Sequence, residues 1–146
     1  AMMKRDTTAY GAIRPAWDRN DCSIRALAVA TGVSYEIASA VYSAQGRRLG
    51  KGTPVDLTRK ILEEHLGMKR VDMVKGWRLD EFLDVAQRGS FIVHKARHAF
   101  AVVEGTVHDW EGTSKGSTRL EDVWKVSEGA RVKMKQLEEL VKELGE

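Results

Sequence analysis

Apolar residues recur at helical spacing in the first half of the chain. Residues 24–31 show this spacing directly after the polar pair Asn20 and Asp21. Asn and Asp are good helix-capping residues, and glycine, here Gly32, commonly ends a helix. The pattern therefore predicts a helix that carries Cys22 in its first turn.

Three more helices are predicted before residue 90. Residues 35–42 have helical apolar spacing behind Ser34, which can cap a helix. Thr53 as a cap and Pro54 at the first helical position predict a helix that ends near residue 67. Residues 79–86 predict a shorter helix.

From residue 90 onward the pattern is typical of strands. Residues 91–93, 99–103 and 106–107 are apolar or β-branched and are separated by short, turn-like breaks. Residues 120–126 predict a last strand after a loop rich in Gly, Ser and Thr. Helices followed by strands indicate an α+β domain, in which N-terminal helices pack on a C-terminal antiparallel sheet.

We expect one domain with peripheral ends. The chain has 146 residues with 42% apolar content, which suffices for one well-buried core. Residues 1–19 predict an extended lead-in, residues 20–126 the domain, and residues 127–146 an amphipathic C-terminal helix. That helix either packs on its own domain or contacts a partner, including a second copy of the chain, and both alternatives stay open.

Charge and cysteine content narrow the classes of function. The 24 Lys and Arg against 21 Asp and Glu give a net charge of +3, too mild and dispersed for a nucleic-acid footprint. No apolar run approaches the roughly 20 residues that cross a bilayer, and the start lacks the apolar stretch of a secretion signal. A lone cysteine fits a reducing compartment. We expect a cytoplasmic protein that binds neither membrane nor nucleic acid.

Cys22 has the setting of a nucleophile. Thiolate rather than thiol attacks a carbonyl, and a helix N-terminus favours the anion through its amides and its positive dipole end. The same amides, particularly that of Cys22, can donate to the oxyanion formed during attack. The alternative is an inert core cysteine, which more often lies in the middle of a helix.

His98 and Asp109 are the candidate partners of Cys22. Of the four histidines, only His98 stands at the start of an apolar strand with a carboxylate on the next strand. If residues 104–105 form a two-residue hairpin turn, Phe100 lies opposite Asp109, which then shares a sheet face with His98. A turn one residue longer would move Asp109 to the other face. The predicted triad depends on this register.

Three segments follow in the order cysteine, histidine, aspartate: Asn20-Asp21-Cys22-Ser23-Ile24-Arg25-Ala26-Leu27, His98-Ala99-Phe100-Ala101-Val102 and Val107-His108-Asp109. Together they resemble the papain-like cysteine peptidase superfamily, over roughly residues 18–110. The resemblance is strongest to small uncharacterised bacteriophage members, which similarly carry an Asn-Asp-Cys helix start, a Gly-Arg-Arg loop and a compact sheet. It implies a papain-like fold and thiol-dependent hydrolysis without a cofactor.

One position departs from this resemblance. The superfamily often places a Gln six residues before the cysteine as an oxyanion donor, and here that position is Ala16. Asn20 has the chemistry to donate instead. An Asn at this place can equally cap the helix with its oxygen turned to the backbone. Both roles of Asn20 stay open.

A metal site is one alternative, because the chain holds five candidate ligands: Cys22, His94, His98, His108 and Asp109. On a continuous strand His94 and His98 lie about 13 Å apart, too far for one ion unless residues 95–97 turn the chain. We therefore expect no metal. His65 and His108 are expected to be structural or solvated.

A phosphate-binding loop is a second alternative. Residues 46–53 contain Gly-Lys before a predicted helix, but the glycine spacing is one residue short. Gly52 also stands where Ser or Thr should follow Lys51 directly. We expect a solvated basic loop.

The expected function is a cysteine-dependent hydrolase of a peptide, isopeptide or small amide, acting on a peptide or protein substrate. The alternative is a phage-encoded binding module that keeps the fold, lacks the chemistry and binds a host protein in the host cytoplasm. A pure binding module has no physical need for a cysteine, a histidine and an aspartate at these places, which favours the hydrolase.

Overall fold

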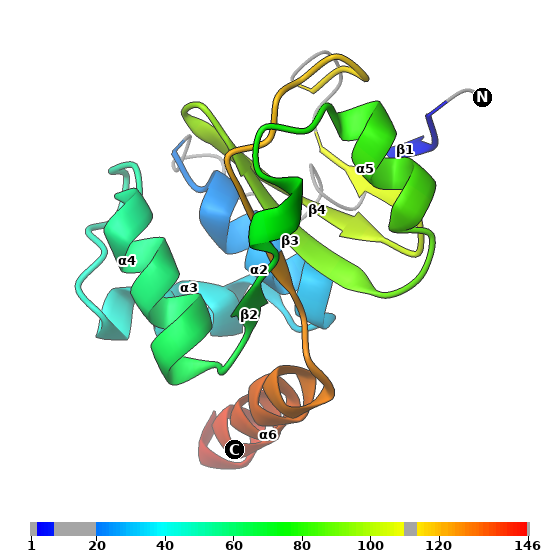
Figure 1. Cartoon of the computed structure of the whole chain (residues 1–146). Helices are drawn as coiled ribbons and strands as arrows, with labels where there is room; N and C mark the ends of the chain where they lie inside the picture. Colours follow the sequence, from blue (N-terminus) through cyan, green and yellow to red (C-terminus); the bar gives the residue numbers. More distant parts are fainter. Residues whose placement is uncertain (1–2, 8–19, 110–113, 146) are drawn as a thin grey trace.

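The computed structural model describes residues 3–7, 20–109 and 114–145. Six strands within these ranges form one sheet in the order β1-β5-β4-β3-β6-β2. Helices cover both faces, with α2, α3 and α6 on one side and α5 on the other (Figure 1). The predicted α+β class is confirmed.

The longer helices and the strands after residue 90 lie close to where the apolar spacing predicts them, whereas β1, β2 and η2 are not predicted. In chain order the described elements are β1 (Arg5–Asp6), α2 (Cys22–Thr31), α3 (Tyr35–Ala44), α4 (Val55–Arg59), the π-helical η1 (Lys60–His65), β2 (Lys69–Arg70), the 3-10 helix η2 (Asp72–Val74), α5 (Leu79–Val85), β3 (Ser90–Lys95), β4 (His98–Val103), β5 (Thr106–His108), β6 (Asp122–Lys125) and α6 (Glu128–Gly145).

The helix ends follow the predicted capping chemistry with two exceptions. Gly32 ends α2 in the left-handed conformation at φ 75°, and the Ser34 side chain accepts a hydrogen bond from the Ile37 amide at 3.3 Å. Pro54 rather than Thr53 occupies the cap of α4. Asp21 rather than Asn20 occupies the cap of α2, so the interpretation of Asn20 as the helix cap is wrong.

The expectation of an antiparallel sheet is wrong at one edge. β1 runs parallel to β5, whereas the other strand pairs are antiparallel. A two-residue polar strand has no apolar alternation to reveal it, and about a hundred residues separate β1 from β5, which leaves either direction open. The outer strands β1 and β2 also come from the first 70 residues rather than from the C-terminal half.

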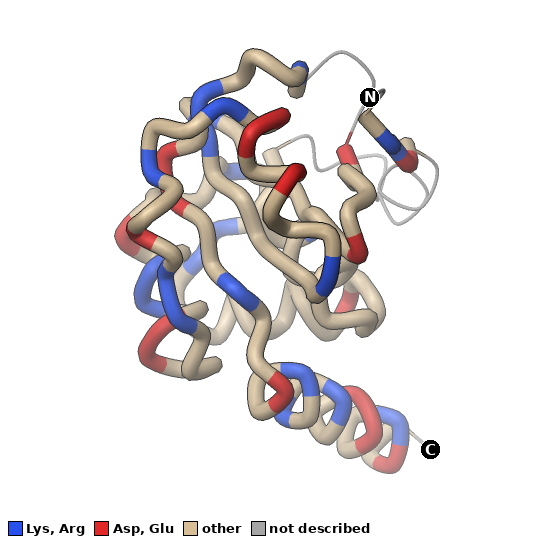
Figure 2. Tube along the Cα trace, turned by 45° about the vertical axis from the view of Figure 1, so that its right-hand side comes forward, with Lys and Arg blue, Asp and Glu red and all other residues tan. Residues whose placement is uncertain are grey.

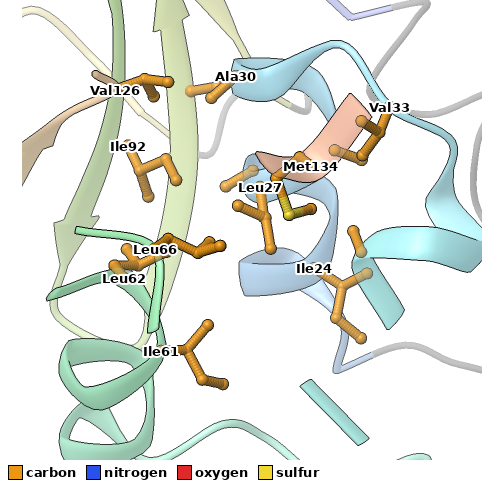
Figure 3. Packing of buried hydrophobic residues seen from close by; sticks show 14 of the residues in the cluster. Ile24, Leu27, Ala30, Val33, Ile61, Leu62, Leu66, Ile92, Val126 and Met134 are labelled. Atoms are coloured by element: carbon orange, nitrogen blue, oxygen red, sulfur yellow. The ribbon is translucent and has the colours of Figure 1, made fainter. Parts of the chain in front are cut away.

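The pleat of the central strands divides the core into two clusters. Ile92, Ala101 and Trp124 face α2, whereas Val93 and Phe100 face α5. Figure 3 shows the first cluster, where side chains of α2, η1, β3 and α6 meet. This packing holds α2 firmly against β4, the two elements that carry Cys22 and His98.

The C-terminal helix α6 packs on its own domain. Its Met134 is fully buried in the α2 cluster (Figure 3), and the Ser34 amide donates to a Glu138 carboxylate oxygen at 2.8 Å. Lys and Arg are mixed with Glu along the rest of the helix (Figure 2). The predicted contact with a second copy stays a prediction.

Two sequence predictions concern the ends and the membrane. Residues 8–19 of the predicted lead-in, which include Ala16 and Trp17, lie outside the described residues, whereas Arg5 and Asp6 form the edge strand β1. Among the helices that the structure describes, none combines the length and apolar content needed to cross a bilayer.

Met134→Ala tests the packing of α6. Removing a fully buried Met side chain should lower the free energy of unfolding by about 2–4 kcal/mol, through lost burial and the cavity left behind. Val132→Ala on the exposed side of the same helix is the matched control and should cost less than about 1 kcal/mol. Urea denaturation measures both, and equal effects would contradict the packing.

Candidate active site

The start of α2 is fixed by a buried ion pair. The side chains of Asp21 and Arg25 are both 0% exposed, and Nε of Arg25 lies 2.9 Å from Oδ1 of Asp21. The Tyr35 hydroxyl donates to the other carboxylate oxygen at 2.8 Å. Asp21 therefore makes no side-chain capping bond, because its oxygens are used by these two groups. A buried charge is tolerated only when paired, so this network holds the residue before Cys22 in one geometry.

His98 reaches Cys22 from the tip of the β3–β4 hairpin. Residues 96–97 turn the chain, so that Lys95 pairs with His98 across the hairpin. The imidazole of His98 forms a hydrogen bond with the Cys22 side chain. The two predicted partners are thus brought together from α2 and β4.

Asp109 is placed by the next hairpin. Glu104 and Gly105 form its turn at φ 49° and 78°, and Val103 pairs with Thr106. The predicted two-residue turn and its register are confirmed. Asp109 follows β5, is fully buried, and has Oδ1 2.6 Å from Nε2 of His98.

The orientation of the imidazole follows from these bonds. Nε2 of His98 is used by Asp109, which leaves Nδ1 as the ring nitrogen for the Cys22 thiol. The ring also stacks on Phe100, with centroids 6.1 Å apart. The carboxylate and the aromatic ring together fix the tautomer and the tilt of the base.

Two further residues, Ser114 and Arg5, support Asp109, and neither is marked by a pattern in the sequence. The Ser114 hydroxyl donates to Oδ2 of Asp109 at 2.7 Å. Nη1 of Arg5 donates to the Ser114 hydroxyl at 3.2 Å, and Nη2 donates to the Ser114 carbonyl. Arg5 comes from the edge strand β1, so the N-terminal segment completes the support of the carboxylate. Neither residue lies in a recognisable motif.

The pKa values of the pair shift in opposite directions. Burial alone raises the pKa of the Cys22 thiol, but the hydrogen bond and positive charge of His98, with the Ala99 amide and the Ser23 hydroxyl, lower it overall. Burial lowers the pKa of His98, but hydrogen bonds to Asp109 and Cys22 and their negative charges raise it to about 9. Both shifts favour the form in which a thiolate lies beside an imidazolium.

Cys22 and His98 open onto a pocket of about 360 Å³. Its wall is formed by the start of α2, the β3–β4 hairpin and the loop before α4, with these lining residues: Asn20, Cys22, Ser23, Gly52, Thr53, His94, Arg97 and His98. The pocket is large enough for part of a substrate and brings it to the thiol.

Asn20 lines this pocket, but its side-chain amide and its backbone carbonyl already make hydrogen bonds. Its Nδ2 donates to the Gly50 carbonyl at 2.8 Å, and the buried Arg47 donates to the Asn20 carbonyl at 3.1 Å. A side-chain amide has a second N–H, so the oxyanion role of Asn20 stays a prediction. The expectation that residues 46–52 form a solvated basic loop is wrong at Arg47, because its side chain is buried.

The spacing argument against a metal applies only to a continuous strand, and the turn that it left open is present. The strand does not continue past Lys95, because residues 96–97 turn, so His94 and His98 both reach the pocket. Nδ1 of His94 lies 3.2 Å from Oε2 of Glu121. Within the described ranges no cluster of three His, Cys, Asp or Glu side chains has the arrangement of a metal site.

The other two histidines lie away from the thiol pair. Nδ1 of His108 is 3.8 Å from Oδ2 of Asp6, and burial lowers the pKa of His108 despite that carboxylate. His65 lies on η1, where its carbonyl accepts a hydrogen bond from Lys133 at 2.6 Å.

Comparison with protein-family models, with curated proteins and with solved structures finds no match to this chain. The papain-like resemblance of the three segments therefore stays a prediction. The geometry of Cys22, His98 and Asp109 stands independently of it.

The pH dependence of Cys22 alkylation by iodoacetamide tests the pair. The thiol should stay reactive below the pH range in which an ordinary thiol ionises, because its pKa is lowered. His98→Ala removes the hydrogen bond and the positive charge while burial remains, so the pKa should rise. The rate at pH 7 should then fall about tenfold for each unit by which the pKa rises.

His65→Ala is the matched control, because His65 lies outside the pocket lining. It should leave the alkylation profile unchanged. A parent protein with an ordinary thiol profile that His98→Ala does not alter would contradict a Cys22–His98 ion pair.

Proposed function

We propose that this protein is a cysteine-dependent hydrolase that cleaves an amide or related acyl bond, as in a peptide, an isopeptide or a small amide. The observation that carries this proposal is the unbroken chain of bonds from Cys22 through His98 to Asp109, with the thiol facing a pocket. A reactive thiolate, an oriented proton carrier and space for an acyl group are the requirements of covalent thiol catalysis.

In the first half-reaction the Cys22 thiolate attacks the carbonyl carbon. A carbon–sulfur bond forms and the carbonyl electron pair moves to oxygen. Backbone amides in the first turn of α2, which begins at Cys22, are the donors that we propose for this oxyanion, because the first amides of a helix have no carbonyl partner within it. The carbon–nitrogen bond then breaks, and the His98 imidazolium protonates the leaving amine.

In the second half-reaction water resolves the thioester. Neutral His98 takes a proton from the water while the water oxygen attacks the acyl carbon. The carbon–sulfur bond then breaks. The carboxylic product leaves, and the Cys22 thiolate and the His98 imidazolium are restored. Asp109 stays ionised throughout and holds the ring in place. Another acceptor in place of water would make the same site an acyltransferase.

The substrate that we propose is a peptide or protein, in a reducing compartment such as the cytoplasm. The chemistry needs a free thiol, which such a compartment preserves. No cofactor takes part in either half-reaction.

Detection of an acyl-enzyme tests the function directly. Incubation with a panel of fluorogenic peptide amides and thioesters, followed by acid quenching and mass spectrometry, should find the acyl mass on the peptide that carries Cys22. His98→Ala should lower kcat/KM by about 10²–10⁴-fold, the usual contribution of a general acid–base group. Cys22→Ala should form no adduct, and His65→Ala should match the parent.

The pH profile of kcat/KM gives a second signature. Activity should fall in acid as the thiolate is protonated, and should fall in base near pH 9 as His98 loses its proton. Asp109→Asn removes a negative charge beside the imidazolium, so the basic limb should move to lower pH. A parent protein that forms no acyl-enzyme with any member of the panel would favour the binding module instead.

A further inference from the structure

Basic and imidazole side chains line the pocket beside Cys22. Among the described residues, the lining includes His94, Arg97 and His98, and no Asp or Glu. Two described carboxylates bonded to lining residues are already engaged, Asp109 with His98 and Glu121 with His94. An anion entering this pocket therefore meets positive charge, with no competing acid among the described lining residues.

Arg97 is one of the residues that line the pocket. It is the residue directly before His98, is exposed, and makes no ion pair with the described part of the chain. Its backbone has φ 61°, in the left-handed region that costs a non-glycine residue about 1 kcal/mol or more. Glycine would fit this turn without strain, so the arginine side chain is present at some cost to the turn.

Two further cations precede the pocket lining in the chain. Arg48 and Lys51 are exposed on the loop that leads to the lining residues Gly52 and Thr53. Neither makes an ion pair within the described ranges. Three exposed cations, Arg48, Lys51 and Arg97, thus belong to the lining or to the loop that leads into it, in a chain whose net charge is only +3.

We infer that the site prefers acyl substrates with a carboxylate next to the scissile bond, and that Arg97 binds this carboxylate. The inference rests on the proposed hydrolase function. A guanidinium offers a planar fork of donors that fits a carboxylate in a bidentate geometry. The carboxylate belongs to an acidic side chain or to the free C-terminus of a peptide, and either source has the same chemistry.

Competition between two alkylating reagents tests the inference without a substrate. Iodoacetate is an anion and iodoacetamide is its neutral analogue, so the ratio of their rates at Cys22 reports the charge preference of the pocket. Arg97→Gln should lower the iodoacetate-to-iodoacetamide ratio about three- to fivefold at low salt, the size of one partly exposed charge interaction. The difference should shrink at 0.5 M salt because the charges are screened.

Arg88→Gln is the matched control. Arg88 is equally exposed but lies before the start of β3, at the end of the hairpin remote from residue 97. The iodoacetate-to-iodoacetamide ratio of Arg88→Gln should equal that of the parent protein. An unchanged ratio in Arg97→Gln, or an equal change in both variants, would overturn the inference.

The readout separates this inference from the proposed function. The iodoacetate-to-iodoacetamide ratio can be measured whether or not the pKa of the Cys22 thiol is lowered. The pH profile with iodoacetamide alone reports whether that pKa is lowered. An ordinary profile with a ratio that depends on Arg97 would reject the hydrolase and retain an anion-binding pocket. An activated thiol with no dependence on Arg97 would retain the hydrolase and reject the anion preference.

Peptide substrates then identify the source of the carboxylate. One arm compares Glu with Gln beside the scissile bond, and the other compares a free C-terminus with an amidated one. The preferred arm should show about fivefold higher kcat/KM for the charged member, and Arg97→Glu should remove or reverse that preference. Equal rates within both arms would contradict the inference.

Discussion

The hydrogen bond of 2.6 Å between Nε2 of His98 and Oδ1 of Asp109 is the constraint on which the site depends. It exists because the hairpin that joins β4 to β5 turns in two residues, with both Glu104 and Gly105 at positive φ. One more residue in that turn would place Asp109 on the opposite face of the sheet. The orientation of the imidazole, and through it the charge on Cys22, is therefore set by backbone geometry.

A fully buried carboxylate requires compensation, and much of the surrounding structure supplies it. Asp109 accepts hydrogen bonds from His98 and Ser114, and Ser114 is in turn held by Arg5. This gives a role to the two-residue strand β1, whose backbone also receives the Asp109 amide at the Asp6 carbonyl. The buried ion pair between Asp21 and Arg25 likewise fixes the residue directly before Cys22. Two buried and paired acids, Asp21 and Asp109, thus fix the positions of Cys22 and His98.

The features that the sequence could predict are local ones. The start of α2 at Cys22 follows from a capping pair and helical spacing, and the His98–Asp109 face follows from a turn of defined length. The edge strands β1 and β2, the support by Ser114, and the burial of Arg25 depend on contacts between distant polar residues, which leave no periodic signal. The turn at residues 96–97 is only an open alternative at the level of sequence, because Ala96 and Arg97 include neither glycine nor asparagine.

That unmarked turn connects the fold to the proposed preference for a carboxylate. In the thiolate–imidazolium form, which both pKa shifts favour, the charges of Cys22 and His98 offset each other, so residues outside the pair set the sign of the field in the pocket. Asp109 lies behind the ring, fully buried and bonded, and its charge is partly offset by the Arg5–Ser114 contacts. Arg97 instead is exposed and lines the pocket, and it belongs to the same turn that delivers His98, with its backbone at φ 61°. The position of the base and the positive charge in the pocket lining are therefore two consequences of one hairpin.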